Sequence, residues 1–311
     1  MGHEVCVRDG AKAAGGMMRY GIPKYRLPRE VLDKEIARIA ELGVKFELSR
    51  EVTDLAAEMK EGGFDAVFLG VGASLARRAY IPAGDAAHVL DAVTVLRSME
   101  GEEQPLLGRR VVVYGGGNTA IDSARTAVRL GAKEVVMLYR RTEEDMPADK
   151  VEIKDALEEG VKIRTLVNPT DFVGIGGKLN SICIMKQKLG QFDSSGRRKA
   201  VPSGETYVEE FDVVIPAISQ TPDTKFIKGT IQLNGNRVVA DRYTQATSMP
   251  GVFVGGDAHR GPKDIVNAVH EAKVAASGID KYLGGSGVLY KGFEQEITDY
   301  HIEGDIVPHD R

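Results

Sequence analysis

Short apolar runs rich in β-branched residues alternate along the chain with longer stretches in which apolar residues recur every three or four positions. The short runs predict buried strands, and the longer pattern predicts amphipathic helices. Strands are expected at residues 44–48, 65–72, 110–114, 134–139, 162–166, 211–218 and 251–257. Helices are expected at residues 28–42, after the glycines at 115–117, near 148–158 and at 264–283. The first of these helices carries Val31, Ile36, Ile39 and Leu42 on one side. Strands that alternate with helices predict an α/β fold with parallel sheets.

The first nine residues look like the end of a helix followed by a strand that stops at an acid, Asp9. The second strand of a dinucleotide-binding unit ends in this way, with a carboxylate that binds the ribose. The first strand and the glycine turn that would precede it are missing from the sequence. Residues 170–190 alternate apolar and polar positions around Gly174-Ile-Gly-Gly177, and no long helix follows. They predict a β-hairpin rather than a nucleotide turn.

The most informative motif in the chain is Gly115-x-Gly117-x-x-Ala120, which lies between a predicted strand and a predicted helix. A dinucleotide-binding fingerprint requires this context. Gly115 permits the tight turn, Gly117 lets a pyrophosphate approach the backbone, and Ala120 keeps the helix close to the sheet. The free N–H groups at the helix start, around Asn118 and Thr119, would face the phosphates. Asn118, together with Asp122 one turn later, would position the helix as much as the cofactor.

The second strand of this unit ends in Arg140 and Arg141, where an NAD site would place Asp or Glu on the ribose 2′-hydroxyl. Paired guanidinium groups favour a 2′-phosphate. The sequence therefore predicts binding of NADP(H). The alternative interpretation is a solvated basic strand end without a ligand.

Composition excludes several classes of function. The 41 basic and 45 acidic residues are mixed along the 311-residue chain and give a net charge of −4, which argues against a nucleic-acid surface. No apolar run approaches the ~20 residues of a membrane span, and no signal-peptide pattern is present, so a cytoplasmic protein is expected. Cys6 and Cys183 are far apart, which excludes a dithiol centre or a four-cysteine cluster, and the histidines show no metal-ligand spacing.

An ordered series of motifs resembles the small (beta) subunit of glutamate synthase and related pyridine nucleotide-flavin oxidoreductases. The matching stretches are Gly15-Gly-Met-Met-Arg-Tyr-Gly-Ile-Pro23, Phe68-Leu-Gly-Val-Gly-Ala73, Gly115-Gly-Gly-Asn-Thr-Ala-Ile-Asp122, Tyr139-Arg-Arg141 with Met146-Pro-Ala148, and Gly255-Gly-Asp257. The resemblance implies two dinucleotide-binding, Rossmann-like domains with parallel sheets, with an NADP domain inserted into a split FAD domain. The implied domains are residues 1–103 (first, incomplete part of the FAD domain), 104–222 (NADP domain), 223–284 (second part of the FAD domain) and 285–311 (an extended tail).

The resemblance also implies which residues bind the adenosine part of FAD and which form the loops around the cofactor. Asp9 would hold the FAD ribose, and Gly15 and Gly16 would line the flavin loop. Gly70 and Gly72 would form the crossover between the domains. Each position has a local alternative, because an acid can simply terminate a strand and glycines serve turns.

A second implied group lies near the flavin ring. Gly256 and Asp257 would lie by the ribityl chain, although Asp257 would alternatively cap the following loop. Asp264 and Ile265 would direct backbone N–H groups and the positive end of the last helix toward the flavin N1–C2 edge, which stabilises negative charge on the reduced flavin. His259 is expected in a solvated loop.

Two departures from the family pattern limit these expectations. The glycine turn that holds the FAD pyrophosphate has no counterpart, and neither has the cysteine-rich region that binds iron–sulfur clusters. We therefore expect a truncated core with weak or absent FAD binding by this chain alone. A sheet that lacks its central strand would invite oligomerisation or strand donation by a partner.

The implied function is that of an NADPH-dependent oxidoreductase. Hydride would pass from NADPH to FAD without a dedicated catalytic nucleophile, and electrons would pass on to iron–sulfur centres of a redox partner, a large subunit or a missing segment. The alternative is a non-catalytic NADP(H)-binding subunit that serves assembly or sensing and lacks functional FAD.

Overall fold

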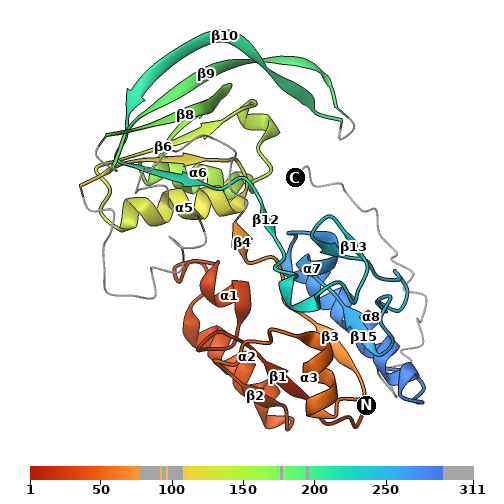
Figure 1. The fold of residues 1–311 in the computed structure, drawn as a ribbon. Helices are drawn as coiled ribbons and strands as arrows, with labels where there is room; N and C mark the ends of the chain where they lie inside the picture. The colour runs from red at the N-terminus through yellow and green to blue at the C-terminus, as the bar shows by residue number, and fades with distance from the viewer. Residues whose placement is uncertain (77–91, 93–95, 97–107, 176–177, 194–195, 290–311) are drawn as a thin grey trace, which may run out of the picture.

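The computed structural model describes residues 1–76, 92, 96, 108–175, 178–193 and 196–289. Figure 1 shows two lobes. We call residues 110–216 the inserted lobe, and residues 1–72 together with 225–289 the split lobe. The antiparallel strands β4 (Leu75–Ala76) and β12 (Gln220–Thr221) pair between the lobes. The predicted domain boundary at 103/104 lies outside the described residues, and the other boundaries stay predictions.

The inserted lobe is built on a four-stranded parallel sheet in the order β11-β5-β6-β7. Its strands are β5 (Arg110–Tyr114), β6 (Glu134–Tyr139), β7 (Lys162–Thr165) and β11 (Val213–Pro216). Its helices are α5 (Asn118–Arg129), α6 (Lys150–Glu158) and the short η1 (Glu143–Asp145). These strands and the two long helices confirm the elements that the sequence predicts there. Because side chains alternate along a strand, Val111 and Val113 pack against the helices while Val112 faces the opposite side.

The opposite face of this sheet is covered by an antiparallel sheet in the order β10-β9-β8. Its strands are β8 (Val167–Ile175), β9 (Lys178–Phe192) and β10 (Arg198–Glu210). The predicted hairpin is confirmed as β8 and β9, and Ile182 and Ile184 of β9 are fully buried in the shared core. The sequence did not predict β10, because its positions are largely exposed and its register shifts between Pro202 and Thr206.

The split lobe combines both ends of the chain. Its main strands form two parallel pairs, β1 (Cys6–Arg8) with β2 (Lys45–Glu47) and β3 (Val67–Leu69) with β15 (Val252–Val254). The remaining elements are α1 (Gly16–Tyr20), α2 (Arg29–Glu41), α3 (Leu55–Gly62), η2 (Lys225–Ile227), β13 (Leu233–Asn234), β14 (Arg237–Val238), α7 (Asp257–Arg260) and α8 (Ile265–Tyr282). Leu69, Val254 and Ile227 share one core cluster, which joins segments from the two ends. None of the described helices combines the length and apolar character that crossing a membrane requires.

The start of the chain differs from the expectation in one detail. Residues 1–5 have no regular structure, so the strand at 6–8 does not follow the end of a helix. Among the described residues no hydrogen-bonded ladder joins β1 to β3, and the split-lobe sheet is therefore in two pieces. Val7 of β1 is 36% exposed and Phe68 of β3 is 38% exposed, whereas Leu69 of β3 is buried, as the pattern predicts.

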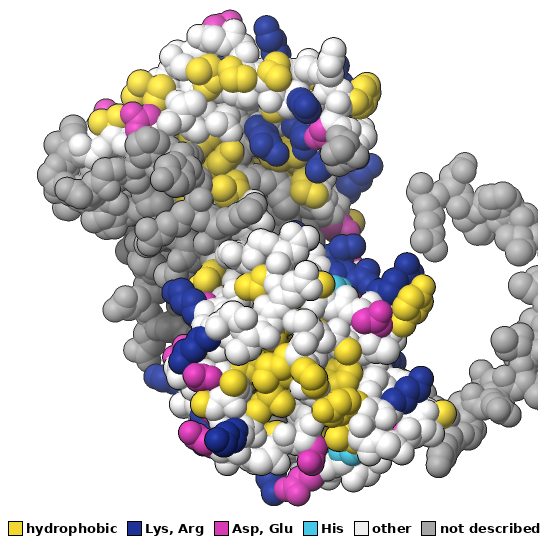
Figure 2. Space-filling model, turned by 45° about the vertical axis from the view of Figure 1, so that its right-hand side comes forward, with side chains coloured by type: hydrophobic (Ala, Val, Ile, Leu, Met, Phe, Trp, Pro, Cys, Tyr) yellow, Lys and Arg dark blue, Asp and Glu magenta, His cyan; other side chains and the backbone are white. Residues whose placement is uncertain are grey.

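The apolar side predicted for α2 is only partly covered. Val31, Ile39 and the following Leu42 are exposed and Ile36 is half-buried, whereas Leu32, which lies beside Gly15, is buried. Helical periodicity identifies an apolar side, but the neighbouring elements decide how much of that side is covered. Figure 2 shows exposed hydrophobic side chains gathered on the split lobe.

Candidate functional site

The turn between β5 and α5 has the geometry that the fingerprint predicts. Gly115 has φ 151°, and a Cβ at this position would lie 2.3 Å from the carbonyl oxygen of Ala217. Ala120 is fully buried against the sheet. A side chain at position 115 would therefore displace the neighbouring strand end, which is why the turn requires glycine.

The start of α5 is open where a phosphate group would bind. A Cβ on Gly117 would meet no atom closer than Cγ of Pro147, at 3.9 Å. The first-turn N–H groups around Asn118 and Thr119 have no intrahelical acceptor, as at any helix start. Asn118 Oδ1 accepts the backbone N–H of Asp149 at 2.9 Å, and so links the starts of α5 and α6. These residues fit the pyrophosphate of a dinucleotide.

Arg140 and Arg141 follow β6, but they face different surroundings. Arg141 is 5% exposed; its Nη2 donates to Asp193 Oδ2 at 2.6 Å, and its Nε donates to the carbonyl of Arg198 at 2.8 Å. Arg140 is exposed and forms no ion pair within the part of the chain that the structure describes. Arg140 is therefore the one with a guanidinium group free to meet a phosphate.

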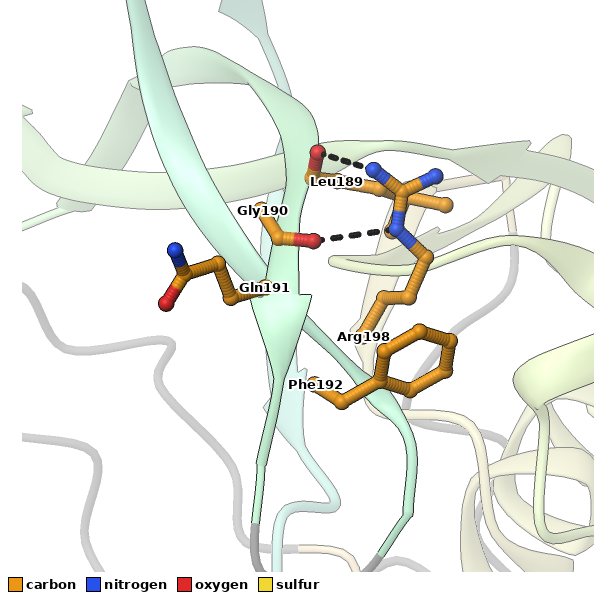
Figure 3. A pocket seen from close by; sticks show the side chains of 5 residues that line it. All are labelled: Leu189, Gly190, Gln191, Phe192 and Arg198. Atoms are coloured by element: carbon orange, nitrogen blue, oxygen red, sulfur yellow. Dashed lines mark hydrogen bonds between the residues drawn. The ribbon is translucent and has the colours of Figure 1, made fainter.

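An open hollow of about 530 Å³ lies on the ends of β9 and β10, next to the partners of Arg141. In Figure 3 the guanidinium group of Arg198 donates to the carbonyls of Gly190 and Leu189, at 2.9 and 2.8 Å, and the ring of Phe192 stands beside its stem. The carbonyl of the same Arg198 accepts from Arg141. The hairpin end is thus fixed to the strand end that carries the two arginines, which the sequence did not reveal.

The predicted crossover and ribityl residues come together at one sheet edge. β3 and β15 are parallel, with Leu69 opposite Val254, so Gly70 and Gly72 lie at the same edge as Gly256 and Asp257. Gly72 and Gly256 both have positive φ, 64° and 69°. The carboxyl ends of parallel strands are the usual ligand-binding edge of such sheets.

The start of α8 is also held by local contacts. Asp257 Oδ1 accepts the N–H of Lys263 at 3.0 Å, and burial raises the pKa of Asp257. Asp264 caps the helix by accepting the N–H of Asn267 at 2.8 Å, and Ile265 opens it. His259 is bonded through Nδ1 to the carbonyl of Val238 at 2.9 Å.

Sequence reasoning missed a buried acid beneath this edge. Glu271 of α8 is 2% exposed, accepts the N–H of Gly256 at 2.7 Å and forms an ion pair with Arg260. It fixes the glycine turn that precedes Asp257. A charged residue inside an amphipathic helix gives no local signal of such a role.

The residues predicted to hold the adenosine side of FAD, Asp9, Gly15 and Gly16, lie next to the β1-β2 pair of the split lobe. Asp9 directly follows β1 and accepts the N–H of Ala11 at 2.8 Å, as in an Asx turn. Gly15 has φ 125° and Gly16 φ 50°, and Gly15 precedes α1. Because no described ladder joins β1 to β3, Asp9 and Gly70 do not share one continuous sheet. The open start of α8 fits the carbonyl edge of a flavin, whereas the described residues provide no strand with a glycine turn that would join the β1-β2 and β3-β15 pairs into one sheet.

Comparison with curated proteins confirms the resemblance. The family model for pyridine nucleotide-disulphide oxidoreductases matches residues 8–272. The chain is 40% identical to the NADP(+)-dependent formate dehydrogenase subunit beta of Moorella thermoacetica, 34% to the glutamate synthase [NADPH] small chain of Escherichia coli and 35% to an NADPH-Fe(3+) oxidoreductase subunit beta of Geobacter sulfurreducens. These alignments cover 91%, 90% and 86% of this chain, but 41%, 65% and 44% of the relatives. The chain thus spans about half the length of these relatives.

Solved structures support the same fold. FprA from Mycobacterium tuberculosis, determined in complex with NADPH, matches with a TM-score of 0.78 at 19% identity, over 90% of this chain and 78% of FprA. Thioredoxin reductase from T. acidophilum matches with a TM-score of 0.67 at 21% identity, over 91% of each chain. The fold is therefore the expected α/β fold with Rossmann-like parallel sheets. The family model and the curated relatives together establish that the chain belongs to the pyridine nucleotide-disulphide oxidoreductase family.

Proposed function

We propose that this chain is the core of an NADPH-dependent flavoprotein oxidoreductase of the glutamate synthase small-subunit type. The observation that carries the proposal is the open turn at residues 115–120, with exposed Arg140 at the end of the adjacent strand. The N–H groups at the start of α5 would bind the pyrophosphate, and Arg140 would contact the 2′-phosphate of NADP(H). Arg141 would add positive charge and hold the hairpin beside it.

The second part of the proposal places FAD in the split lobe. Gly256 and Asp257 would face the ribityl chain, and the start of α8 at Ile265 would direct its N–H groups toward the flavin. Asp9 would bind the adenosine ribose. FAD, when bound, supplies the acceptor for the hydride of NADPH. The protein's part is to hold the two rings close together and away from water.

The proposed electron acceptor is an iron–sulfur protein or a larger subunit in the cytoplasm. Two of the relatives are named as beta subunits and one as a small chain, which supports assembly with other chains. The net charge of −4 does not favour nucleic acid as a partner. Pairing of two copies through the open edges of β1 and β3 is the proposed route to a homo-oligomer.

A different class of function is favoured by one observation. The split-lobe sheet is in two pieces among the described residues, so the FAD pyrophosphate has no turn to bind there. In this alternative the chain binds NADP(H) on the inserted lobe and serves assembly or sensing without hydride transfer.

One set of measurements separates the two. The purified chain is titrated with NADPH and NADH by calorimetry, its flavin absorbance is recorded, and NADPH-driven dye reduction is followed with and without added FAD. The proposal expects NADPH to bind more tightly than NADH and added FAD to stimulate dye reduction. Binding of NADPH without reduction under any FAD concentration supports the alternative. No NADPH binding at millimolar concentration contradicts both.

A further inference from the structure

A short segment of the split lobe, Tyr25 and Arg26, contacts the two helices of the inserted lobe. In the chain it lies between α1 and α2, which Figure 1 shows in the split lobe. We call this the interlobe contact; its members in the inserted lobe are Asp122, Arg125, Arg129 and Glu152.

Arg26 links both helices at once. Its Nη1 donates to both carboxylate oxygens of Asp122 in α5, at 2.8 and 2.9 Å, and its Nε lies 2.9 Å from Glu152 Oε1 in α6. The Asp122 side chain is only 6% exposed, so its charge depends on this partner for compensation. The residues are 96 positions apart in the sequence, and no local pattern predicts the pair.

Tyr25 packs against the next turn of the same helix. Its ring centroid lies 4.8 Å from Cζ of Arg125 and 4.0 Å from Cζ of Arg129, which is cation–π geometry. Arg125 is buried and paired with Glu152 at 2.5 Å and with Glu159 at 2.8 Å. The hydroxyl of Tyr25 is buried and has no hydrogen-bond partner among the residues that the structure describes, so the ring rather than the hydroxyl makes this contact.

The segment is held in place from its own side. Arg29, in the first turn of α2, donates to the carbonyls of Ile22 at 2.9 Å and Leu27 at 3.0 Å, one on each side of Tyr25 and Arg26. The N–H of Arg26 also donates to the carbonyl of Pro23 at 3.0 Å. Tyr25 and Arg26 therefore lie on a turn that contacts within the split lobe hold in place, and they meet two helices that pack against each other.

We propose that Arg26 is a positioning residue, which with Tyr25 fixes the orientation of α5, and of a nucleotide bound at its start, relative to the split lobe. The inference rests on the proposed function for the identity of that nucleotide. The described strands between the lobes are only the two-residue strands β4 and β12, and lobes joined in this way move relative to each other by default. Asp122 lies one helical turn from the proposed pyrophosphate site. A contact to it therefore limits the motion of the lobes close to the nucleotide, and so helps to keep the nicotinamide ring aligned with the flavin ring.

The chain provides its own probe pair for a test. Its two cysteines lie in different lobes, Cys6 in β1 and Cys183 in β9, and both are partly accessible. Spin labels on these thiols report the distribution of interlobe distances in the full chain. In Arg26→Gln the population outside the wild-type distance should rise about tenfold, which corresponds to ~1.4 kcal/mol. Tyr25→Ala should act in the same direction, so the test does not depend on one variant folding.

Matched variants distinguish the loss of interlobe positioning from a non-specific effect of a substitution on folding. Tyr25→Phe keeps the ring and should keep the wild-type distribution. Arg38→Gln removes an exposed pair with Glu35 within α2 and should also leave the distribution unchanged. NADPH affinity should change less than about twofold in Arg26→Gln, because Arg26 contacts Asp122 and not the pyrophosphate turn.

The outcomes are distinct from those that test the proposed function. Unchanged distances in both Arg26→Gln and Tyr25→Ala overturn the positioning role. A tenfold loss of NADPH affinity with unchanged distances overturns it as well, since Arg26 would then act on the nucleotide site itself. If the wild-type chain binds no NADPH, the proposed function fails, while the distance measurement still decides whether Arg26 holds the lobes.

Discussion

Arg141 and Asp193 form a 2.6 Å ion pair that joins the end of β6 to the hairpin of β9 and β10. The sequence predicts that the adjacent Arg140 and Arg141 both bind the 2′-phosphate of NADP(H), but in the structure the guanidinium group of Arg141 is already paired with Asp193. The side chain of Arg141 is 6% exposed and that of Asp193 19%, so the pair is largely shielded from solvent. The two arginines are therefore expected to respond differently to substitution.

Arg140→Ala should weaken NADPH binding about tenfold or more, because a charge-assisted hydrogen bond contributes ~1.5–3 kcal/mol. NADH, which lacks the 2′-phosphate, should bind as before. Arg141→Ala should instead lower thermal stability, because Asp193 loses its guanidinium partner. Calorimetric titrations and melting curves of both variants check this. An unchanged preference for NADPH in the double variant would remove the 2′-phosphate assignment.

Gly115 and Gly117 should also behave differently. Gly115→Ala places a Cβ 2.3 Å from a backbone oxygen and should destabilise the chain by about 1–3 kcal/mol. In Gly117→Ala the new Cβ makes only an ordinary contact, 3.9 Å from Pro147 Cγ, and φ is −94°, so the chain should fold normally while NADPH binding weakens. Chemical denaturation and nucleotide titration of each variant make the comparison. Normal NADPH affinity in Gly117→Ala would show that the pyrophosphate lies elsewhere.

The pH dependence of stability should report Asp122. Burial raises its pKa to about 6, against the opposing effect of Arg26, with Glu152 raising it further and Arg125 lowering it. The folded state then retains a proton that the unfolded chain, with a pKa near 3.8, releases. The free energy of unfolding should therefore fall as pH rises from about 4 to about 6, by on the order of 3 kcal/mol from this group.

Asp122→Asn is the matched variant for that measurement. It keeps the shape and an acceptor oxygen but cannot titrate, so this component of the pH dependence should disappear. Urea unfolding at half-unit pH steps compares the two proteins. Identical slopes would mean that Asp122 titrates near its ordinary value and that burial does not govern its charge.

Glu271 should be needed for the Gly256 turn. Glu271→Ala removes the acceptor of the Gly256 N–H and the partner of Arg260, and should cost about 1–3 kcal/mol of stability. Glu271→Gln keeps an acceptor for the N–H and should lose less. The stimulation of dye reduction by added FAD should fall in the same order. If both variants melt like the wild type, the turn at Gly256 does not depend on this side chain.

The sequence by itself determined the local features of the proposed nucleotide site. The turn at Gly115, the helix start at Asn118 and the Asp264 cap of α8 each depend on residues within a few positions of one another, so chain order is enough to specify them. The strands of the parallel sheets follow from short apolar runs for the same reason.

The tertiary structure decided which arginine side chain is free to bind a phosphate and which residues of α2 are buried. Arg141 looks equivalent to Arg140 in the sequence, but Asp193, 52 positions away, occupies it. Asp122 pairs with Arg26 across the two lobes, and within α2 Val31 and Ile39 stay exposed while Leu32 is buried. These outcomes depend on contacts between segments far apart in the chain, and neither periodicity nor turn chemistry contains information about such contacts.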